Sequence, residues 1–206
     1  DLPCMDDDDL RRGLPTVHRA FGEWQAVLAG DYLLTRAFDC LADSPCLSDG
    51  QRLELVRCLG QAAGAHGMIG GQVIDLESEG LALELEELQR LHLLKTGAMI
   101  CAALDFGAIV AGADAKTRSA LRAFGQKIGL AFQVVDDVLD VTNEERKGRC
   151  SDAENNKATY VSLLGVEAAR RCAERLHAEA LDALVAVEGD ISELHVLADA
   201  IIQRTY

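Results

Sequence analysis

The sequence predicts an all-α protein, and three observations support this prediction. All three prolines lie at or before Pro45, so the long remainder of the chain has no proline to interrupt a helix. Apolar side chains there recur at intervals of three and four, the period of an amphipathic helix. Aromatic residues make up 4% of the chain, and strict apolar–polar alternation over a strand length is hard to find. We expect roughly seven to nine helices in one bundle.

The first expected helices are separated by recognisable boundary signals. Asp43-Ser44-Pro45 ends one helix, and Ser48-Asp49 is typical of the cap that begins the next. A stripe of apolar and small residues then covers Gln51–Leu76, and Gly80 closes the segment that follows it. Four glycines of this stretch, at positions 64, 67, 70 and 71, would each cost about 1 kcal/mol in a helix relative to Ala. The close approach of a neighbouring helix is the compensation that we expect, and contact with a ligand is the alternative.

The later helices follow the same logic. A second apolar stripe runs from Leu85 to Ala98, and Gly112-Ala113-Asp114 separates two further helices. The polar stretch Thr142–Thr159 contains glycine and an Asn pair, so we expect a loop there. A third stripe covers Val161–Val187.

Length and charge limit the possible classes of protein. The 206 residues, 49% of them hydrophobic, are enough for a substantial core, and no linker or internal repeat is visible. We therefore expect residues 1–206 to form a single domain. The formal net charge of −14 argues against a nucleic-acid partner, because phosphate backbones bind basic surfaces. An anionic substrate would need bound metal to reverse the local sign of the charge.

The cysteines and the apolar runs indicate a cytoplasmic protein. The seven cysteines form no CxxC or zinc-knuckle pattern, so we expect reduced thiols, several of them in the core. No apolar run reaches the ~18 residues of a membrane span, and no signal peptide is visible. The sequence begins with Asp1 inside a charged motif, and we expect that an N-terminal part of the natural protein is missing.

A cluster of carboxylates interrupts an otherwise apolar helical stretch near position 136. On a helix Asp136 and Asp140 lie one turn apart on the same face, with Asp137 beside them. Three carboxylates this close repel one another, and a divalent cation relieves the repulsion. Magnesium prefers oxygen ligands and typically takes one or two carboxylates plus phosphate oxygens. The cluster therefore indicates a magnesium site, with a solvated acidic face as the alternative.

A second acidic cluster lies at the start of the chain. Asp1 and the four aspartates at positions 6–9 supply carboxylates, and Arg11 and Arg12 follow directly. Arginine suits bidentate contact with phosphate. An acidic run at a terminus is usually a solvated tail, but the arginine pair and the second cluster favour a diphosphate–magnesium site. The sequence lacks an EF-hand loop, a pair of Glu-x-x-His motifs and a phosphate-binding P-loop.

Five motifs in order resemble the trans-isoprenyl diphosphate synthases of the polyprenyl synthetase family. Residues 1–13 (DLPCMDDDDLRRG) are similar to the first aspartate-rich motif of that family without its leading Asp, and residues 132–140 (FQVVDDVLD) to the second. Gly70-Gly71-Gln72-Val73-Ile74-Asp75, Lys95-Thr96-Gly97 and Lys157-Ala158-Thr159-Tyr160 fall in the order of the family between and after them. The long form of the first motif is similar to that of bacterial farnesyl and plant-type geranylgeranyl synthases.

The resemblance implies a role for each matching residue. Asp1, Asp6, Asp136, Asp137 and Asp140 would bind magnesium, with three ions expected around the diphosphate. Arg11 and Lys95 would contact the allylic diphosphate, and Arg12 the isopentenyl diphosphate. Thr96 and Gln133 would line the developing carbocation. Lys157 and Lys147 would complete the diphosphate cage, with Gln72 and Asp75 at its edge.

The resemblance also implies the fold and the reaction. A helical isoprenoid synthase bundle would surround a central apolar cavity, without the N-terminal helices of the family. There isopentenyl diphosphate would be condensed with dimethylallyl or geranyl diphosphate, diphosphate would be released, and farnesyl diphosphate is the expected product. A homodimer is implied as well. The segment Val141–Asn156 looks shorter than usual for the family, and Asn156 stands where Gly is customary.

Three alternatives stay open. A geranylgeranyl diphosphate synthase differs only in product length, and the residues that set this length in the family precede the first motif. A class I terpene cyclase would need an Asn/Asp-x-x-Ser/Thr-x-x-x-Glu motif, and Asp75-x-x-Ser78 is followed by Ala82 where Glu is required. A non-catalytic partner subunit of a prenyl synthase would tend to lose the aspartate motifs, which this chain keeps.

Overall fold

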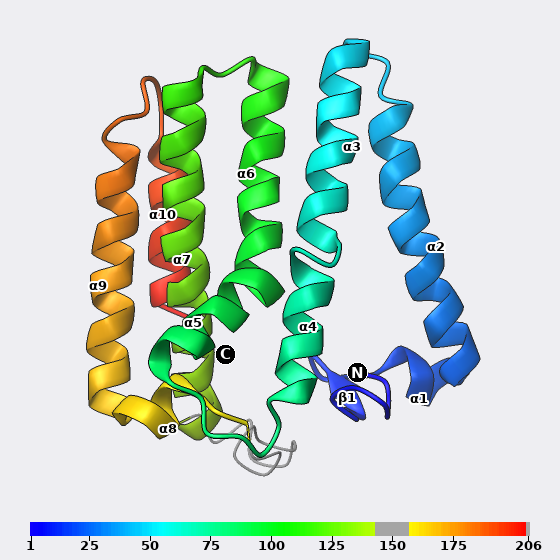
Figure 1. Ribbon diagram of the computed structural model, residues 1–206, viewed down its shortest axis with the longest axis vertical. Helices are drawn as coiled ribbons and strands as arrows, with labels where there is room; N and C mark the ends of the chain where they lie inside the picture. Colours follow the sequence, from blue (N-terminus) through cyan, green and yellow to red (C-terminus); the bar gives the residue numbers. More distant parts are fainter. Residues whose placement is uncertain (143–156, 205–206) are drawn as a thin grey trace.

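The longest helix, α7 (Ala115–Thr142), is the element around which the others are arranged. The computed structural model describes residues 1–142 and 157–204. In it α7 packs most extensively against α9 (Val166–Leu184) and also against α6 (Ala98–Ala111) and α10 (Ser192–Ile202) (Figure 1). The inward face of α7 contributes Phe124 and its neighbours in the core, all of them buried. This helix therefore gives the second aspartate motif a rigid base.

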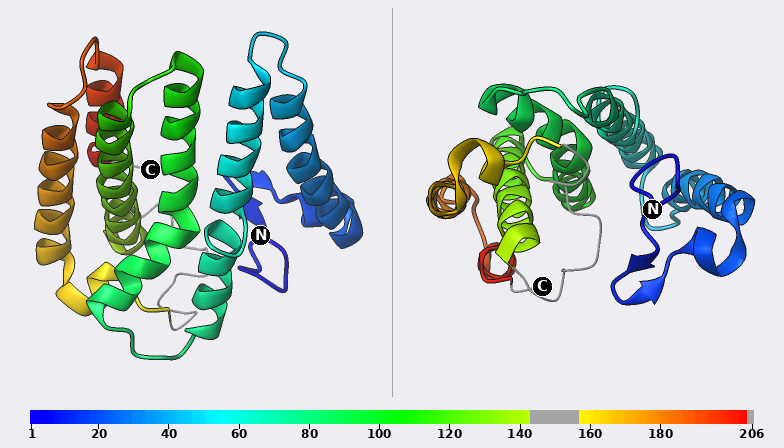
Figure 2. Two further views of the ribbon diagram at one scale, coloured as in Figure 1. Left: turned by 45° about the horizontal axis from the view of Figure 1, so that its top comes forward. Right: turned by 90° about the horizontal axis from the view of Figure 1, so that it is seen from below.

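A second group of helices lies beside α6. α3 (Asp49–Ala63) packs against α6 and leads into α4 (Met68–Glu77), while α2 (Glu23–Ala42) packs against α3. Figure 2 shows α2 at the outer edge of the molecule, opposite α9. α2 buries none of its residues, although it carries many apolar side chains.

Short elements cluster at one end of the bundle (Figure 1). They are β1 (Leu10–Arg11), β2 (Leu14–Pro15), α1 (Val17–Phe21), α5 (Leu85–His92), η1 (Leu93–Gly97) and α8 (Tyr160–Leu164). β1 and β2, of two residues each, form an antiparallel hairpin at the end of the first aspartate motif. η1 is a π-helical turn between α5 and α6, and such turns occur frequently at functional sites.

The predicted all-α class is confirmed, and the number of helices was underestimated. The described residues contain ten α-helices and the π-helical turn, where about seven to nine helices were expected. The short helices α1 and α8, of five residues each, explain the difference, since an apolar stripe needs two turns to be visible. The hairpin was not predicted either, because its strands have only two residues each.

The expected boundaries at Ser48 and Gly112 agree with the structure. Ser48 accepts a hydrogen bond from the Gln51 backbone N–H, and the Gln51 side chain reaches back to complete a capping box. Gly112 ends α6 in the left-handed conformation, with φ at 65°, as glycine does at many helix ends. Thr159 caps α8 with Ser162, which fixes the backbone just after Lys157.

The glycine-rich stretch is not one helix. Gly64 caps the end of α3 and Gly67 precedes α4, so the chain breaks between them. A Cβ at Gly67 would lie 2.1 Å from the carbonyl oxygen of Ala62. The expected close helix packing is found at Gly71, because a Cβ there would lie 2.2 Å from the backbone nitrogen of Lys95. α4 and η1 therefore touch backbone to backbone.

One continuous helical stretch, Leu85–Ala111, is apolar and long enough to cross a membrane by length and composition alone. No membrane-spanning run was expected from the sequence, and Lys95 and Asp105 lie within this stretch. In the structure this stretch is α5, η1 and α6, and it carries Lys95 and Thr96 into a cluster of polar contacts. We interpret it as a helix of the bundle.

The thiols are more exposed than predicted. Of the six cysteines in the described residues, only Cys172 is buried, and Cys4, Cys40 and Cys46 are exposed. Several cysteines were expected in the core, but among the described residues one is buried there. Cys58 and Cys101 are partly buried.

Candidate active site

The two aspartate clusters lie at the same end of the bundle. Asp136, Asp137 and Asp140 occupy the last turns of α7, at the end where the N-terminal segment also lies (Figure 1). The C-terminal end of α4, the turn η1 and the residues before α8 surround the same region. Residues that are separated by more than a hundred positions therefore lie at one end of the bundle.

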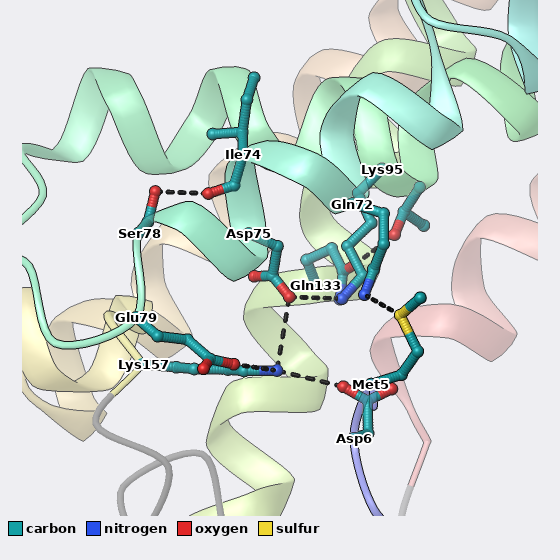
Figure 3. A network of polar contacts seen from close by, with 11 residues as sticks. Met5, Asp6, Gln72, Ile74, Asp75, Ser78, Glu79, Lys95, Gln133 and Lys157 are labelled. Atoms are coloured by element: carbon teal, nitrogen blue, oxygen red, sulfur yellow. Dashed lines mark hydrogen bonds and ion pairs between the residues drawn. The ribbon is translucent and has the colours of Figure 1, made fainter. Parts of the chain in front are cut away.

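Lys157 is the centre of a network of ion pairs (Figure 3). Its Nζ lies 3.1 Å from Oδ1 of Asp6, 3.4 Å from Oδ2 of Asp75 and 3.7 Å from Oε1 of Glu79. Lys95 donates to the same Oδ2 of Asp75 at 2.8 Å. The side chain of Lys157 is 11% exposed, so its ammonium group sits among these carboxylates with little contact with water.

The pKa of Asp6 reflects this network. Partial burial works to raise the pKa of Asp6, but the hydrogen bond and the charge of Lys157, with the charge of Lys95, outweigh it. The pKa therefore lies below its ordinary value, and the carboxylate is ionised at neutral pH. The ionised form of Asp6 is the one that could bind a metal cation or hold the ammonium group of Lys157 in place.

Thr96 and Gln133 form a direct contact across the site. The hydroxyl of Thr96, in η1, donates to Oε1 of Gln133 on α7. The resemblance gave both residues the same task, lining a carbocation, and the structure brings their oxygens together. Gln72, on α4, points to the N-terminal segment, where its Nε2 lies 3.7 Å from the sulfur of Met5 (Figure 3).

The second aspartate motif is engaged by groups from the C-terminal part of the chain. Oδ1 of Asp136 accepts a hydrogen bond from Arg204 at 3.0 Å, and the guanidinium of Arg204 lies 4.1 Å from the centre of the Phe132 ring. Asp137 is buried, and its Oδ2 accepts from the backbone N–H of Tyr160 at 2.6 Å. These contacts tie the end of α7 to α8 and α10.

A pair of stacked rings lies beneath this motif. His92 and Tyr160 have ring centroids 5.7 Å apart and planes inclined by 14°. Neither ring nitrogen of His92 has a hydrogen-bond partner among the described residues. Burial, the main cause, lowers the pKa of His92 to about 4, so the ring is neutral at pH 7. The stack joins α5 to the start of α8.

The first aspartate motif is irregular. Arg11 forms an ion pair with Asp1 at 3.0 Å, while Arg12 lies in the hairpin turn with φ at 52°. Thr16 is buried beneath the acidic run, and its hydroxyl donates to the carbonyl oxygen of Asp8 at 2.8 Å. The positions of the Asp1 and Asp6 carboxylates therefore depend on ion pairs and on one buried hydroxyl.

The structure joins some of the predicted site residues and leaves others apart. Lys157 forms ion pairs with Asp6 and with Asp75, and Asp75 also pairs with Lys95. Separate contacts join Thr96 with Gln133 and Asp1 with Arg11. Lys147 lies outside the described residues. The metal and substrate roles of all these residues stay predictions.

The donor set can be compared with the needs of magnesium. Within residues 1–142 and 157–204 no three His, Cys, Asp or Glu side chains converge on one point as a ready metal site. Magnesium needs only one or two carboxylates when phosphate oxygens and water complete its shell. The aspartates of the two motifs are hard oxygen donors of this kind, so they fit an ion that is shared with a diphosphate.

Four residues of the site were missed by the sequence analysis. Glu79 lies in the turn after α4, four positions beyond Asp75, and this short separation was the one signal that could have placed both near the same group. Tyr160 belongs to the last motif but was given no role, and His92 and Arg204 gave no signal as site residues, because the contacts of all three join distant parts of the chain.

The protein is an all-α bundle that carries carboxylates, ammonium groups and a hydroxyl–amide pair at one end. This arrangement is typical of helical proteins that bind an anionic group beside an apolar interior. The particular family follows from comparison with known proteins. The family model described as polyprenyl synthetase matches residues 1–194, and the chain belongs to this family.

Individual relatives agree with the family. The chain is 48% identical to the farnesyl diphosphate synthase of Escherichia coli (99% of this chain and 71% of that protein). It is 45% identical to the large subunit 1 of a heterodimeric geranylgeranyl pyrophosphate synthase of Arabidopsis thaliana (99% of this chain and 58% of that protein). Two curated farnesyl diphosphate synthases from Geobacillus stearothermophilus and Bacillus subtilis are matched over 59% of their length.

A solved structure is also similar over nearly the whole chain. It is a geranyltransferase of Helicobacter pylori complexed with magnesium and isoprenyl diphosphate, with a TM-score of 0.86 and 40% identity over 98% of this chain and 67% of that one. The predicted family and the isoprenoid synthase fold are therefore confirmed. The names of the relatives also confirm the predicted class of enzyme, a short-chain trans-prenyltransferase.

Proposed function

We propose that this protein condenses an allylic diphosphate, dimethylallyl or geranyl, with isopentenyl diphosphate and releases inorganic diphosphate. The observation that carries the proposal is the convergence of Lys95 and Lys157 on one carboxylate next to the Thr96–Gln133 pair. Two ammonium groups can bind the leaving diphosphate, and two neutral oxygens beside them can stabilise a cation without capturing it.

The residues of the site divide the reaction between them. Lys95, Lys157 and Arg11 would bind the allylic diphosphate, and Arg12 the isopentenyl diphosphate. Magnesium, bound by Asp1, Asp6, Asp136, Asp137 and Asp140, would neutralise charge on the departing diphosphate, and we propose three ions for it. Lys147 would join the cage. Gln72 would orient the N-terminal segment at its edge.

The same residues control the fate of the cation. The Oγ1 of Thr96 and the amide oxygen of Gln133 present their negative ends to positive charge on the allylic carbon. The double bond of isopentenyl diphosphate then attacks this carbon, and the released diphosphate takes up the proton that leaves. The apolar side chains of the bundle exclude water, which would otherwise capture the cation.

Farnesyl diphosphate is the product that we propose. The relatives include curated proteins named for farnesyl and for geranylgeranyl products, with the higher identity to a farnesyl synthase. Geranylgeranyl diphosphate is the alternative product. We also propose that the protein acts in the cytoplasm.

A second copy of the chain is the partner that we propose. The outer surface of α1 and α2 exposes large apolar side chains, and a homodimer would cover them. Phe21, Trp24, Leu28 and Tyr32 are 70%, 68%, 56% and 65% exposed. Light scattering should give twice the chain mass, and Trp24→Ser with Leu28→Ser should shift the protein toward the monomer.

The reaction is tested by product analysis. The protein is incubated with magnesium, labelled isopentenyl diphosphate and either dimethylallyl, geranyl or farnesyl diphosphate, and the products are separated by chain length. Elongation of the first two primers to a C15 product supports the proposal. Elongation of farnesyl diphosphate to C20 supports the alternative product, and no elongation of any primer refutes a synthase.

A further inference from the structure

We propose that Asp75 is a positioning residue that sets the spacing of the two diphosphate-binding lysines, Lys95 and Lys157, before substrate arrives. The inference rests on the proposed function, because that function gives both lysines their ligand. Asp75 would not contact the diphosphate itself, since two anions repel. Its task is to hold two cations at the separation that the diphosphate requires.

The geometry shows one oxygen that serves two cations. Oδ2 of Asp75 lies 2.8 Å from Nζ of Lys95 and 3.4 Å from Nζ of Lys157 (Figure 3). The side chain of Asp75 is 12% exposed, so both contacts are largely shielded from water. Ion pairs of this kind constrain geometry more than exposed ones, which are screened and mobile.

The backbone beneath Asp75 fixes one of the two partners. Gly71 lies one helical turn before Asp75 on α4, and the backbone nitrogen of Lys95 is 2.2 Å from the place of its missing Cβ. α4 and η1 cannot approach this closely with any side chain at position 71. The distance from Asp75 to Lys95 is therefore determined by backbone contact as well as by charge.

The second partner comes from a separate part of the chain. Lys157 precedes α8, whose first residue, Tyr160, is tied to Asp137 by a backbone hydrogen bond. The Lys157 ammonium reaches from there across to α4. Asp75 thus joins α4, η1 and the segment before α8 at a single oxygen.

Electrostatics explains why a carboxylate is needed. Two ammonium groups bound to one oxygen lie only a few ångströms apart and repel each other in a shielded site. The negative charge of Asp75 offsets this repulsion and keeps both lysines extended toward the same point. Without it the two side chains would separate, and a diphosphate would have to bring them together at the expense of its binding free energy.

Glu79 supplies a matched control. It lies in the turn directly after α4 and also contacts Lys157, at 3.7 Å, but it is 41% exposed and no described contact joins it to Lys95. A change at Glu79 removes the same charge from the same region without removing the shared oxygen.

The first experiment measures binding of inorganic pyrophosphate in the presence of magnesium chloride by calorimetry. Asp75→Asn should weaken binding about tenfold or more, while Glu79→Gln should change it less than about threefold. Asp75→Glu keeps the charge but moves it. Its affinity for pyrophosphate should lie between that of Asp75→Asn and that of the wild type. Unchanged or tighter binding by Asp75→Asn would overturn the proposal, as would wild-type affinity of Asp75→Glu.

The second experiment separates positioning from a general structural role. Lys95→Met and Lys157→Met are combined in a double-mutant cycle, with pyrophosphate affinity as the readout. In the wild-type background we expect the losses of pyrophosphate affinity from Lys95→Met and Lys157→Met to be non-additive by about tenfold, because Asp75 couples the two lysines that bind the same ligand. In the Asp75→Asn background they should become additive. Equal coupling in both backgrounds would overturn the proposal.

The outcomes distinguish this inference from the proposed function. Wild-type protein that binds pyrophosphate but elongates no primer would refute the synthase and leave the Asp75 result to stand on its own. Wild-type protein that does not bind pyrophosphate would refute both. If Asp75→Asn loses its helical circular dichroism, the Asp75→Glu comparison decides the question.

Discussion

The two aspartate motifs are similar in composition but are supported by the fold in opposite ways. The second motif lies on a helix of 28 residues that is anchored in the core, with Asp137 buried and Asp136 and Asp140 partly exposed. The first lies in irregular backbone, with Asp7 and Arg12 at positive φ and a two-residue hairpin behind it. A helix sets the spacing of its carboxylates by its own period, whereas the irregular segment depends on partners.

This contrast assigns different tasks to the charged partners. Arg11 and Lys157 orient Asp1 and Asp6, so the first motif takes its geometry from side-chain ion pairs. Arg204 contacts Asp136, whose position α7 already determines. We therefore expect a change at the partly exposed Asp136 to remove function without altering structure, and changes in the first motif to act on both.

The largest effect is expected for Asp136→Ala. It removes a proposed metal ligand from a rigid helix, and turnover should fall by about three orders of magnitude or more. Helical circular dichroism should stay unchanged, because Asp136 is on the surface of α7. Asp182→Ala, an exposed carboxylate on α9, is the control and should keep full activity. Retained activity of Asp136→Ala would refute its role as a ligand.

The next largest effect is expected for Asp6→Asn. It keeps the size of the side chain but removes the charge that pairs with Lys157, so turnover should fall about a hundredfold and the magnesium concentration for half activity should rise. Asp7→Asn removes the same charge next to it, and Asn tolerates the positive φ of this position. Equal losses in the two variants would show that net charge, and not the Asp6 position, matters.

Low pH should lower the free energy of unfolding by protonating His92, which packs beside the second motif. The pKa of His92 is lowered from 6.5 to about 4 in the folded protein, so the unfolded chain binds more protons between these values. Stability should therefore fall as the pH drops below 6.5, by about 2 kcal/mol between pH 7 and pH 5. Denaturant unfolding of wild type and His92→Phe, which keeps a ring on Tyr160, measures this. The same fall in both proteins would exclude His92 as its source.

The smallest effect is expected for Thr16→Val. The substitution keeps the shape of the side chain but leaves the carbonyl oxygen of Asp8 without its donor, at a cost of about 1–2 kcal/mol in unfolding free energy. Thr35→Val, on the exposed face of α2, removes a similar hydroxyl–carbonyl bond and should cost less than about 0.5 kcal/mol. A loss of activity in Thr16→Val without a loss of stability would mean that the segment rearranges locally.

Local patterns in the sequence predicted most of the fold. The apolar stripes identified the long helices, and Ser48 and Gly112 marked real ends, because caps are decided by neighbouring residues. The second aspartate motif could be placed on a helix face for the same reason. The break at Gly64–Gly67 was missed, since glycine is compatible both with a tight helix contact and with a chain break.

The site itself was less predictable than its parts. Asp75 and Lys157 are separated by 82 positions, and no spacing rule connects them. The contact of Arg204 with Asp136 spans 68 positions and depends on how α10 returns to α7. The resemblance to a family named the lysines and aspartates, but only tertiary packing shows which carboxylate each lysine contacts.

The π-helical turn at Leu93–Gly97 contains one residue more than an α-helical turn would. The directions in which Lys95 and Thr96 point therefore depend on the number of residues in this segment. Each residue of an α-helix rotates the chain by about 100°. Deletion of a single residue between α5 and Lys95 would let the stretch relax into a regular helix. The two helices would stay intact, but Lys95 and Thr96 would turn away from Asp75 and Gln133. For this segment, a one-residue change in length is a more severe mutation than most substitutions.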